Sequence, residues 1–234
     1  RSKQMRLIDT HSHLFLEEFS EDLPQVIERA RSAGVTHIFM PNIDSTTIDS
    51  MLSVCNTYND YCFPMIGLHP TSVNADYEKE LEIVARELRS FNKYIAIGEV
   101  GMDLYWDKTF LKEQQIVLDK QINWALEYDL PVVIHCRDAF GYIYNVLEPY
   151  KNTSLKGVFH SFTGTDDEAA RILEFSGFLI GINGVVTFKK SRLPEVLTKI
   201  PLEKIVLETD SPYLTPVPNR GKRNESAYVK DTLM

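Results

Sequence analysis

The sequence predicts an α/β fold, a (β/α)₈ barrel of the TIM type in which residues 1–234 form a single domain. Eight short apolar runs alternate with segments of helical periodicity, and neither a linker-like nor a low-complexity stretch interrupts them. The length of 234 residues lies in the range of single-domain barrels. An open, doubly wound sheet is the alternative architecture. It normally has a glycine-rich phosphate turn after its first strand, where this chain reads "THSHLF".

The predicted strands are short, often β-branched and bounded by Gly, Pro or polar residues, as buried parallel strands are. In chain order they cover 7–13, 35–40, 63–67, 94–100, 131–136, 156–161, 178–183 and 205–210. The segments between them carry apolar residues at helical spacing. Pro24 near its start and Gly34 at its end mark the first helix. "YEKELEIVARELRSF" and "TFLKEQQIVLDKQINWALEYD" are the next clear helices, and shorter ones are expected near 46–57, 139–149, 166–175 and 191–199.

The composition limits the possible partners and compartments. A formal charge of −8 disfavours non-specific coating of nucleic acid, so an anionic substrate needs a local positive site made of metal ions or arginines. The three cysteines, Cys55, Cys62 and Cys136, are too scattered for a disulfide framework or a zinc knuckle, which favours a reducing compartment. No apolar run approaches membrane-spanning length. We therefore expect a soluble, cytoplasmic protein without a membrane partner.

Polar residues collect where the predicted strands end. Five of the six histidines lie at these ends or just past them, together with two carboxylates: His11, His13, His69, Glu99, His135, His160 and Asp210. The remaining histidine, His37, lies inside the second run and is interpreted as structural. A barrel brings the carboxyl ends of all its strands to one mouth, where so many imidazoles and carboxylates are costly to bury without a metal or a substrate. The pattern predicts a metal site.

The donor set indicates the kind of metal and the chemistry. Imidazole and carboxylate together suit Zn²⁺, Mn²⁺ or Mg²⁺. Six donors are too many for one tetrahedral ion but suit two divalent ions that share a carboxylate: His11, His13, Glu99, His135, His160 and Asp210. Glu99, near the middle of the ring, is the expected bridge. Two such ions lower the pKa of a shared water for hydrolysis, and Asp210 is expected to act both as ligand and as general base.

Three neighbouring residues are given supporting or structural roles. Glu208 shares the strand face of Asp210 one layer deeper, and Asp9 lies one layer below the first two histidines. Both are expected to act from behind the ligands rather than to bind the metal. Cys136 follows His135 directly, and strand alternation turns its thiol away from the mouth, which argues against a nucleophilic cysteine.

Seven sequence blocks extend over nearly the whole chain: "DTHSH", "GLHP", "AIGEVGMD", "PVVIHCRDA", "FHSFTG", "GFLIGINGVVTF" and "LETDSPYLTP". In this order they resemble the TatD family of metal-dependent deoxyribonucleases, within the amidohydrolase-like barrels. The resemblance implies a TIM-type barrel and a hydrolase that cleaves DNA phosphodiester bonds with divalent metal ions, as a 3′–5′ exodeoxyribonuclease. It implies DNA, with single-stranded ends, as the partner.

The resemblance also assigns individual residues. It assigns one ion to His11, His13, Glu99 and Asp210, and a second ion to Glu99, His135 and His160. His69 and Arg137 are implied to contact the scissile phosphate, whose oxygens accept hydrogen bonds from imidazole and guanidinium groups. The basic loop "PNRGKRNES" adds Arg220 as a further expected phosphate contact, with Lys222 and Arg223 beside it. A solvated surface loop is the other interpretation of this segment.

Two positions depart from the family pattern. Ser226 stands where the family has proline, and we expect it to cap the last helix. The chain ends at Met234, soon after that helix begins, which predicts a shortened eighth helix.

Two other functions stay open from the sequence. The same metal and water chemistry serves another ester or amide, such as an aminoacyl-tRNA, although His69, Arg137 and the basic loop favour phosphate. A non-catalytic barrel that binds nucleic acid is the alternative from another class. It predicts a broken ligand ring, whereas all six ligand positions are filled. No obligate protein partner is expected.

Overall fold

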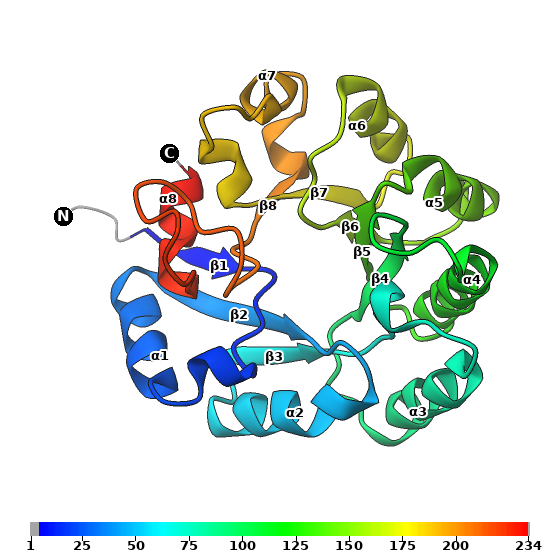
Figure 1. The fold of residues 1–234 in the computed structure, drawn as a ribbon, viewed down its shortest axis with the longest axis horizontal. Helices are drawn as coiled ribbons and strands as arrows, with labels where there is room; N and C mark the ends of the chain where they lie inside the picture. The colour runs from blue at the N-terminus through cyan, green and yellow to red at the C-terminus, as the bar shows by residue number, and fades with distance from the viewer. Residues whose placement is uncertain (1–4, 234) are drawn as a thin grey trace.

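Within residues 5–233, which this computed structural model describes, eight parallel strands form a ring and eight α-helices surround it (Figure 1). The strands are β1 (Leu7–Asp9), β2 (Val35–Pro41), β3 (Cys62–Met65), β4 (Ile97–Asp103), β5 (Val132–Arg137), β6 (Gly157–Phe159), β7 (Phe178–Ile182) and β8 (Ile205–Leu207). A helix follows each strand, so the predicted (β/α)₈ barrel is confirmed and the open sheet is not the architecture.

The ring closes through two short junctions. Strands β1 to β3 pair in one sheet, and strands β4 to β8 pair in another. Parallel bridges between Ile66 and Ile97 and between Ser12 and Ser211 join the two sheets. The second bridge connects the loop after β1 to the loop after β8, so residues nearly two hundred positions apart become neighbours at the mouth.

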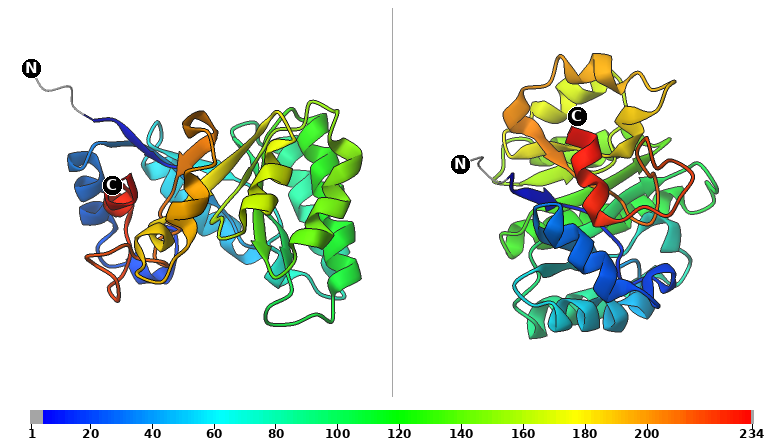
Figure 2. Two further views of the ribbon diagram at one scale, coloured as in Figure 1. Left: turned by 90° about the horizontal axis from the view of Figure 1, so that it is seen from above. Right: turned by 90° about the vertical axis from the view of Figure 1, so that its left-hand side faces the viewer.

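The helices cover the outside of the ring, as the two views in Figure 2 show. They are α1 (Leu23–Ser32), α2 (Ile48–Thr57), α3 (Tyr77–Ser90), α4 (Leu111–Glu127), α5 (Phe140–Leu147), α6 (Asp166–Leu173), α7 (Leu193–Leu197) and α8 (Val229–Leu233). Helix α1 buries Val26, Ile27 and Ala30 on its inner face, with Pro24 in its first turn. It ends before Gly34, whose φ of +96° and close approach to the backbone of Met5 require glycine.

The first and last strands are shorter than predicted. β1 ends at Asp9 and β8 ends at Leu207, so His11, His13 and Asp210 lie in the loops that follow. Strand alternation therefore does not set their direction. Instead, the backbone N–H of Asp210 donates to the carbonyl of His11 over 2.8 Å, which ties the two loops together at the mouth.

The end of the chain packs against its beginning. α8 contacts β1 and β8, and Figure 2 shows this last segment, in red, beside α1, in blue. The expectation that Ser226 caps the last helix is wrong, because its buried hydroxyl donates to Ser12 Oγ instead. No helix within residues 5–233 has the length and hydrophobicity that a membrane span requires.

Candidate metal centre

Four side chains converge at the junction of β8 and β1. Nε2 of His11 lies 3.2 Å from Glu99 Oε2 and 3.5 Å from Asp210 Oδ1. Nε2 of His13 lies 3.8 Å and 3.0 Å from the same two oxygens. An ion about 2.1 Å from each donor separates neighbouring donors by about 3.0 to 3.4 Å. The distances of 3.2 and 3.0 Å fall in this range and those of 3.5 and 3.8 Å lie just above it, so the four atoms are close to the spacing of ligands to one metal ion.

A second group surrounds the other oxygen of Glu99. Oε1 lies 2.8 Å from His160 Nε2 and 3.1 Å from His135 Nδ1. His69 Nε2 lies 3.4 Å from the same oxygen. These imidazoles come from the ends of three different strands, β6, β5 and β3, or from the loops just past them. The structure therefore brings all six predicted donors, and His69 with them, to one mouth.

Glu99 connects the two groups, since each of its oxygens faces one of them. Its side chain is only 4% exposed, and this burial opposes a negative charge. The imidazoles of His160, His69 and His11 nevertheless hold the pKa of Glu99 well below 4.5. Glu99 is therefore a buried, charged carboxylate placed between two sets of nitrogen donors, as a bridging ligand must be.

The buried nitrogens of His11 fit a metal better than they fit hydrogen bonds. Nε2 is close to two carboxylates, yet neither it nor Nδ1 has a hydrogen-bond partner among the described residues. A buried polar atom without a partner costs about 1–3 kcal/mol. A divalent cation between Nε2 and the carboxylates would remove that cost, so the His, Glu and Asp groups here are able to hold metal.

Two imidazoles of the second group are held from behind by carboxylates. Glu208 Oε1 lies 3.1 Å from His160 Nδ1, and Asp103 Oδ2 lies 2.8 Å from His135 Nε2. In both rings the remaining nitrogen faces Glu99. A carboxylate that fixes the far nitrogen of a histidine is typical of metal sites. This geometry agrees with the supporting role expected for Glu208.

Asp103 is missing from the sequence-based prediction. It is 5% exposed, and Gln114 holds its backbone through two hydrogen bonds, of 2.8 and 3.1 Å. The sequence did contain a signal for it. Every second residue of a strand points to the same face, so Asp103 shares the face of Glu99 on β4.

Asp9 supports the first group through the backbone. Its carboxylate accepts the N–H of His11 over 3.3 Å and the N–H of Thr209 over 2.9 Å, and so links the loop after β1 to the end of β8. Burial raises the pKa of Asp9 to about 7, despite the hydrogen bonds from Thr209. Asp9 therefore positions His11 and does not enter the ring of donors.

His69 presents a hydrogen-bond donor to the mouth. The backbone N–H of Thr71 donates to its Nδ1 over 3.1 Å. Burial lowers the pKa of His69, so the ring is neutral and its single proton lies on Nε2, beside Glu99. A nitrogen that carries a proton cannot ligate a metal but can donate to a phosphate oxygen, as the expected contact with the scissile phosphate requires.

The basic residues near the mouth differ in what they contact. Arg137 is exposed and stacks over Tyr105, at 3.8 Å from the ring centre. Arg220 is also exposed and lies 3.8 Å from the ring centre of Phe188. Arg223 instead forms an ion pair with Asp22 over 2.6 Å, so its charge is compensated locally.

Two further residues lie outside the set of metal donors. The Nδ1 of His37 lies 2.8 Å from Thr36 Oγ1, and its ring stacks on Phe63, which agrees with the structural role expected for it. Burial raises the pKa of the Cys136 thiol to about 12, so this cysteine is not a thiolate nucleophile at neutral pH.

We expect metal binding to release protons and to weaken as the pH falls. Burial disfavours a charge on three of the imidazoles, but neighbouring carboxylates outweigh this effect and raise the pKa of each above 6.5. The carboxylates are Asp210 and Glu99 for His13, Asp103 and Glu99 for His135, and Glu208 and Glu99 for His160. These rings therefore hold a proton to a higher pH than an ordinary histidine, and a metal must displace it. The pKa values of Glu99 and Asp210 are lowered, so these carboxylates stay ionised in the same pH range.

Calorimetric titration with Mn²⁺ at about pH 6 and about pH 8, in two buffers of different ionisation enthalpy, measures this release. We expect proton release at both pH values and weaker binding at the lower one. An affinity that does not change with pH, together with no proton release, would contradict the expectation.

Comparison of the chain with known proteins finds a matching family. The family described as "TatD related DNase" matches residues 8–234. A Bacillus subtilis protein named "Uncharacterized metal-dependent hydrolase YabD" is 39% identical over 225 residues, which cover 96% of this chain and 87% of that protein. A Pantoea ananatis protein named "3'-5' ssDNA/RNA exonuclease TatD" is 32% identical over 233 residues, covering 97% of this chain and 89% of that protein.

A solved structure agrees with the fold. The crystal structure of YjjV, a TatD homologue from Escherichia coli, superimposes with a TM-score of 0.89 at 32% sequence identity. The match covers 99% of this chain and 90% of that one. The barrel and the order of its elements are therefore those of a known hydrolase architecture.

Proposed function

The chain belongs to the family of TatD-related DNases and is a metal-dependent hydrolase, and we propose that it is a 3′–5′ exonuclease that cleaves the phosphodiester bonds of DNA at single-stranded ends. The observation that carries this proposal is the position of Glu99, whose Oε2 lies beside His11 and whose Oε1 lies beside His160 and His135. The name of the Pantoea relative supports the substrate class. An enzyme that spares nucleic acid and hydrolyses an aminoacyl-tRNA ester or an amide is the competing proposal.

The proposed cofactors are two divalent ions, Mg²⁺, Mn²⁺ or Zn²⁺. One would be held by His11, His13, Asp210 and Oε2 of Glu99, and the other by His135, His160 and Oε1 of Glu99. When bound, such ions lower the pKa of a water molecule and offset the charge of a phosphate. Glu208 and Asp103 would keep the protons of His160 and His135 on the nitrogens that face away from the ions.

Asp210 is the proposed general base. Its side chain is 15% exposed, whereas that of Glu99 is 4% exposed, so solvent reaches the carboxylate of Asp210 more easily than that of Glu99. Burial opposes its charge, but the hydrogen bond with His13 lowers its pKa, which keeps it ready to accept a proton at neutral pH. Glu99 lies too deep for this role and would act on the reaction by holding both ions.

Hydrogen-bond donors would orient the phosphate. The Nε2–H of His69 lies beside Glu99 in the mouth, and Arg137 is exposed at the end of β5. Within residues 5–233, Arg137 forms no ion pair with a carboxylate, so its guanidinium is available to bind an anion. Arg220 would add a further positive charge. These donors favour a phosphate over a carboxylic ester.

A digestion ladder tests the proposal. Oligonucleotides labelled at the 5′ end, as single strands and as duplexes, are incubated with the purified chain and Mg²⁺, Mn²⁺ or Zn²⁺. We expect single strands to shorten one nucleotide at a time from the 3′ end and EDTA to stop the reaction. Metal-loaded protein that leaves every oligonucleotide intact but hydrolyses an aminoacyl ester would refute the nuclease proposal.

Three broader expectations stay predictions. They are that residues 1–234 work as a single domain, that the protein acts in the cytoplasm, and that it needs no obligate protein partner.

A further inference from the structure

Two large aromatic side chains are exposed just past the end of β4. Tyr105 is 51% exposed and Trp106 is 73% exposed, which is unusual for rings of this size. They contact each other edge to face, with ring centres 4.7 Å apart. The mechanism proposed above uses neither of them.

An arginine completes this pair. The guanidinium of Arg137, at the end of β5, lies 3.8 Å from the ring centre of Tyr105 and 5.5 Å from that of Trp106. The register of the sheet fixes this arrangement, because Asp103 pairs with Arg137 and the N–H of Leu104 donates to the Arg137 carbonyl over 3.0 Å. Tyr105 therefore holds the cation in place, and the more exposed ring of Trp106 stays free.

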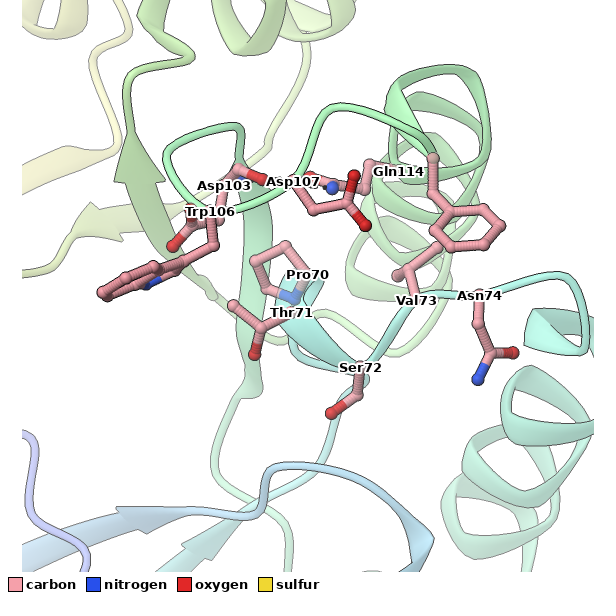
Figure 3. A pocket seen from close by; sticks show the side chains of 10 residues that line it. Pro70, Thr71, Ser72, Val73, Asn74, Asp103, Trp106, Asp107 and Gln114 are labelled. Atoms are coloured by element: carbon pink, nitrogen blue, oxygen red, sulfur yellow. Dashed lines mark hydrogen bonds between the residues drawn. The ribbon is translucent and has the colours of Figure 1, made fainter.

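The aromatic pair is connected to the metal centre by very few residues. Asp103 contacts His135 over 2.8 Å, and the same carboxylate accepts the backbone N–H of Tyr105 over 3.1 Å. Trp106 and Asp103 also line a cavity of about 230 Å³ between the loops after β3 and β4. Figure 3 shows Trp106 and Thr71 at one end of this cavity and Val73 and Asn74 at the other. Thr71 in turn contacts His69, so the cavity adjoins the mouth on two sides.

We propose that Trp106, with Tyr105 and Arg137 beside it, is a stacking platform for a nucleobase of a single-stranded nucleic acid. This inference rests on the proposed function, and Asp103, which contacts both His135 and the backbone of Tyr105, connects the platform to the metal centre. A base stacks on an exposed ring only when it is not paired, so the platform would select single strands over duplexes. Arg137 would hold the phosphate while Trp106 holds the base.

The chemistry of the platform favours a base over an apolar partner. Arg137 gives it a positive charge, although the whole chain carries −8. Within residues 5–233 Arg137 forms no ion pair with a carboxylate, since Asp103 is hydrogen-bonded to His135 and Asp107 to Thr109. An exposed aromatic ring beside a guanidinium is the arrangement that sequence-independent single-strand binders use.

Tryptophan fluorescence tests the platform without turnover. The sequence contains two tryptophans, and Trp124 is 9% exposed, so a change in emission on binding reports Trp106. The intact chain in EDTA is titrated with a single-stranded oligonucleotide, with the same strand containing abasic sites, and with a duplex. We expect the intact single strand alone to quench the emission strongly and Trp106→Phe to remove this change. Equal quenching by the abasic strand would place phosphate, not a base, at the ring and overturn the proposal.

Kinetics give a second, independent measurement. We expect Trp106→Ala to raise KM for single-stranded oligonucleotides about tenfold with little change in kcat, and Trp106→Phe to recover most of the loss. Tyr128→Ala is the matched control, because Tyr128 is a partly exposed aromatic that follows α4, at the opposite end of the barrel. Wild-type KM in Trp106→Ala would refute the platform.

The two proposals fail in different ways. A chain that cleaves single strands but shows neither the quenching nor the rise in KM keeps its proposed function and loses the platform. A chain that cleaves no oligonucleotide but is quenched only by the strand that carries bases loses the nuclease proposal and keeps the platform. Absence of both cleavage and quenching would refute both.

Discussion

Replacing Glu99 by glutamine is expected to empty both metal groups and to abolish hydrolysis. Glutamine keeps the size of the side chain but removes the charge that His11 and His13 face on one side and His135 and His160 face on the other. Its amide nitrogen would also direct hydrogen atoms at nitrogens that must offer lone pairs. We expect metal affinity to fall by at least about 100-fold and kcat by about 10³-fold.

Metal content is the decisive measurement for this variant. Elemental analysis after dialysis against Mn²⁺ or Zn²⁺ reports the number of ions per chain, and circular dichroism shows whether the barrel still forms. Glu99→Asp is the informative comparison, because it keeps the charge on a shorter side chain that reaches only one group. We expect it to retain part of the bound metal. A Glu99→Gln protein with full metal content and more than a tenth of the wild-type rate would contradict the bridging role.

Most of the fold follows from local patterns in the sequence. The apolar runs and the helical repeats between them correspond to the eight strands and the helices that follow them, because a parallel strand buried on both faces has few other compositions. The boundaries could not be obtained in this way. The sequence 7–13 looks like one strand, but β1 ends at Asp9. Beyond it, one bridge between Ser12 and Ser211 and separate backbone hydrogen bonds join the chain to the loop after β8 without a continuous ladder.

The candidate site was predictable because a barrel brings the carboxyl ends of all its strands together, whatever their separation in the sequence. His11 and Asp210 are far apart in sequence, yet their side chains come within 3.5 Å once strand ends share one mouth. The individual contacts were not predictable. The tautomer of His69 depends on the backbone N–H of Thr71, and Arg223 is neutralised by Asp22, across most of the chain. Neither relation leaves a periodic signal in the sequence.

Replacing Asp210 by asparagine is expected to lower kcat by about 10²- to 10⁴-fold while the fold stays intact. The Asp210 backbone has a φ of +58°, a left-handed conformation that asparagine adopts at least as readily as aspartate. The substitution therefore leaves the turn after β8 and its hydrogen bond to His11 in place. It removes the charge beside His13 and the group that accepts a proton. We expect kcat to fall much more than KM changes, because the phosphate contacts of His69 and Arg137 persist.

A matched variant separates this effect from a general change of backbone or charge. Asp129 also has a positive φ, of 51°, and lies before β5 at the opposite end of the barrel, where its only ion pair in the described part of the chain is with Lys156. Asp129→Asn should retain wild-type kcat and lose at most about 1 kcal/mol of stability. Thermal unfolding and metal content are measured for both variants alongside the rate. An Asp210→Asn protein that binds metal normally and keeps more than a tenth of kcat would show that the proton goes elsewhere. The same variant with normal metal content and a rate at least 100-fold lower would support Asp210 as the base, because loss of metal could then not account for the slower reaction.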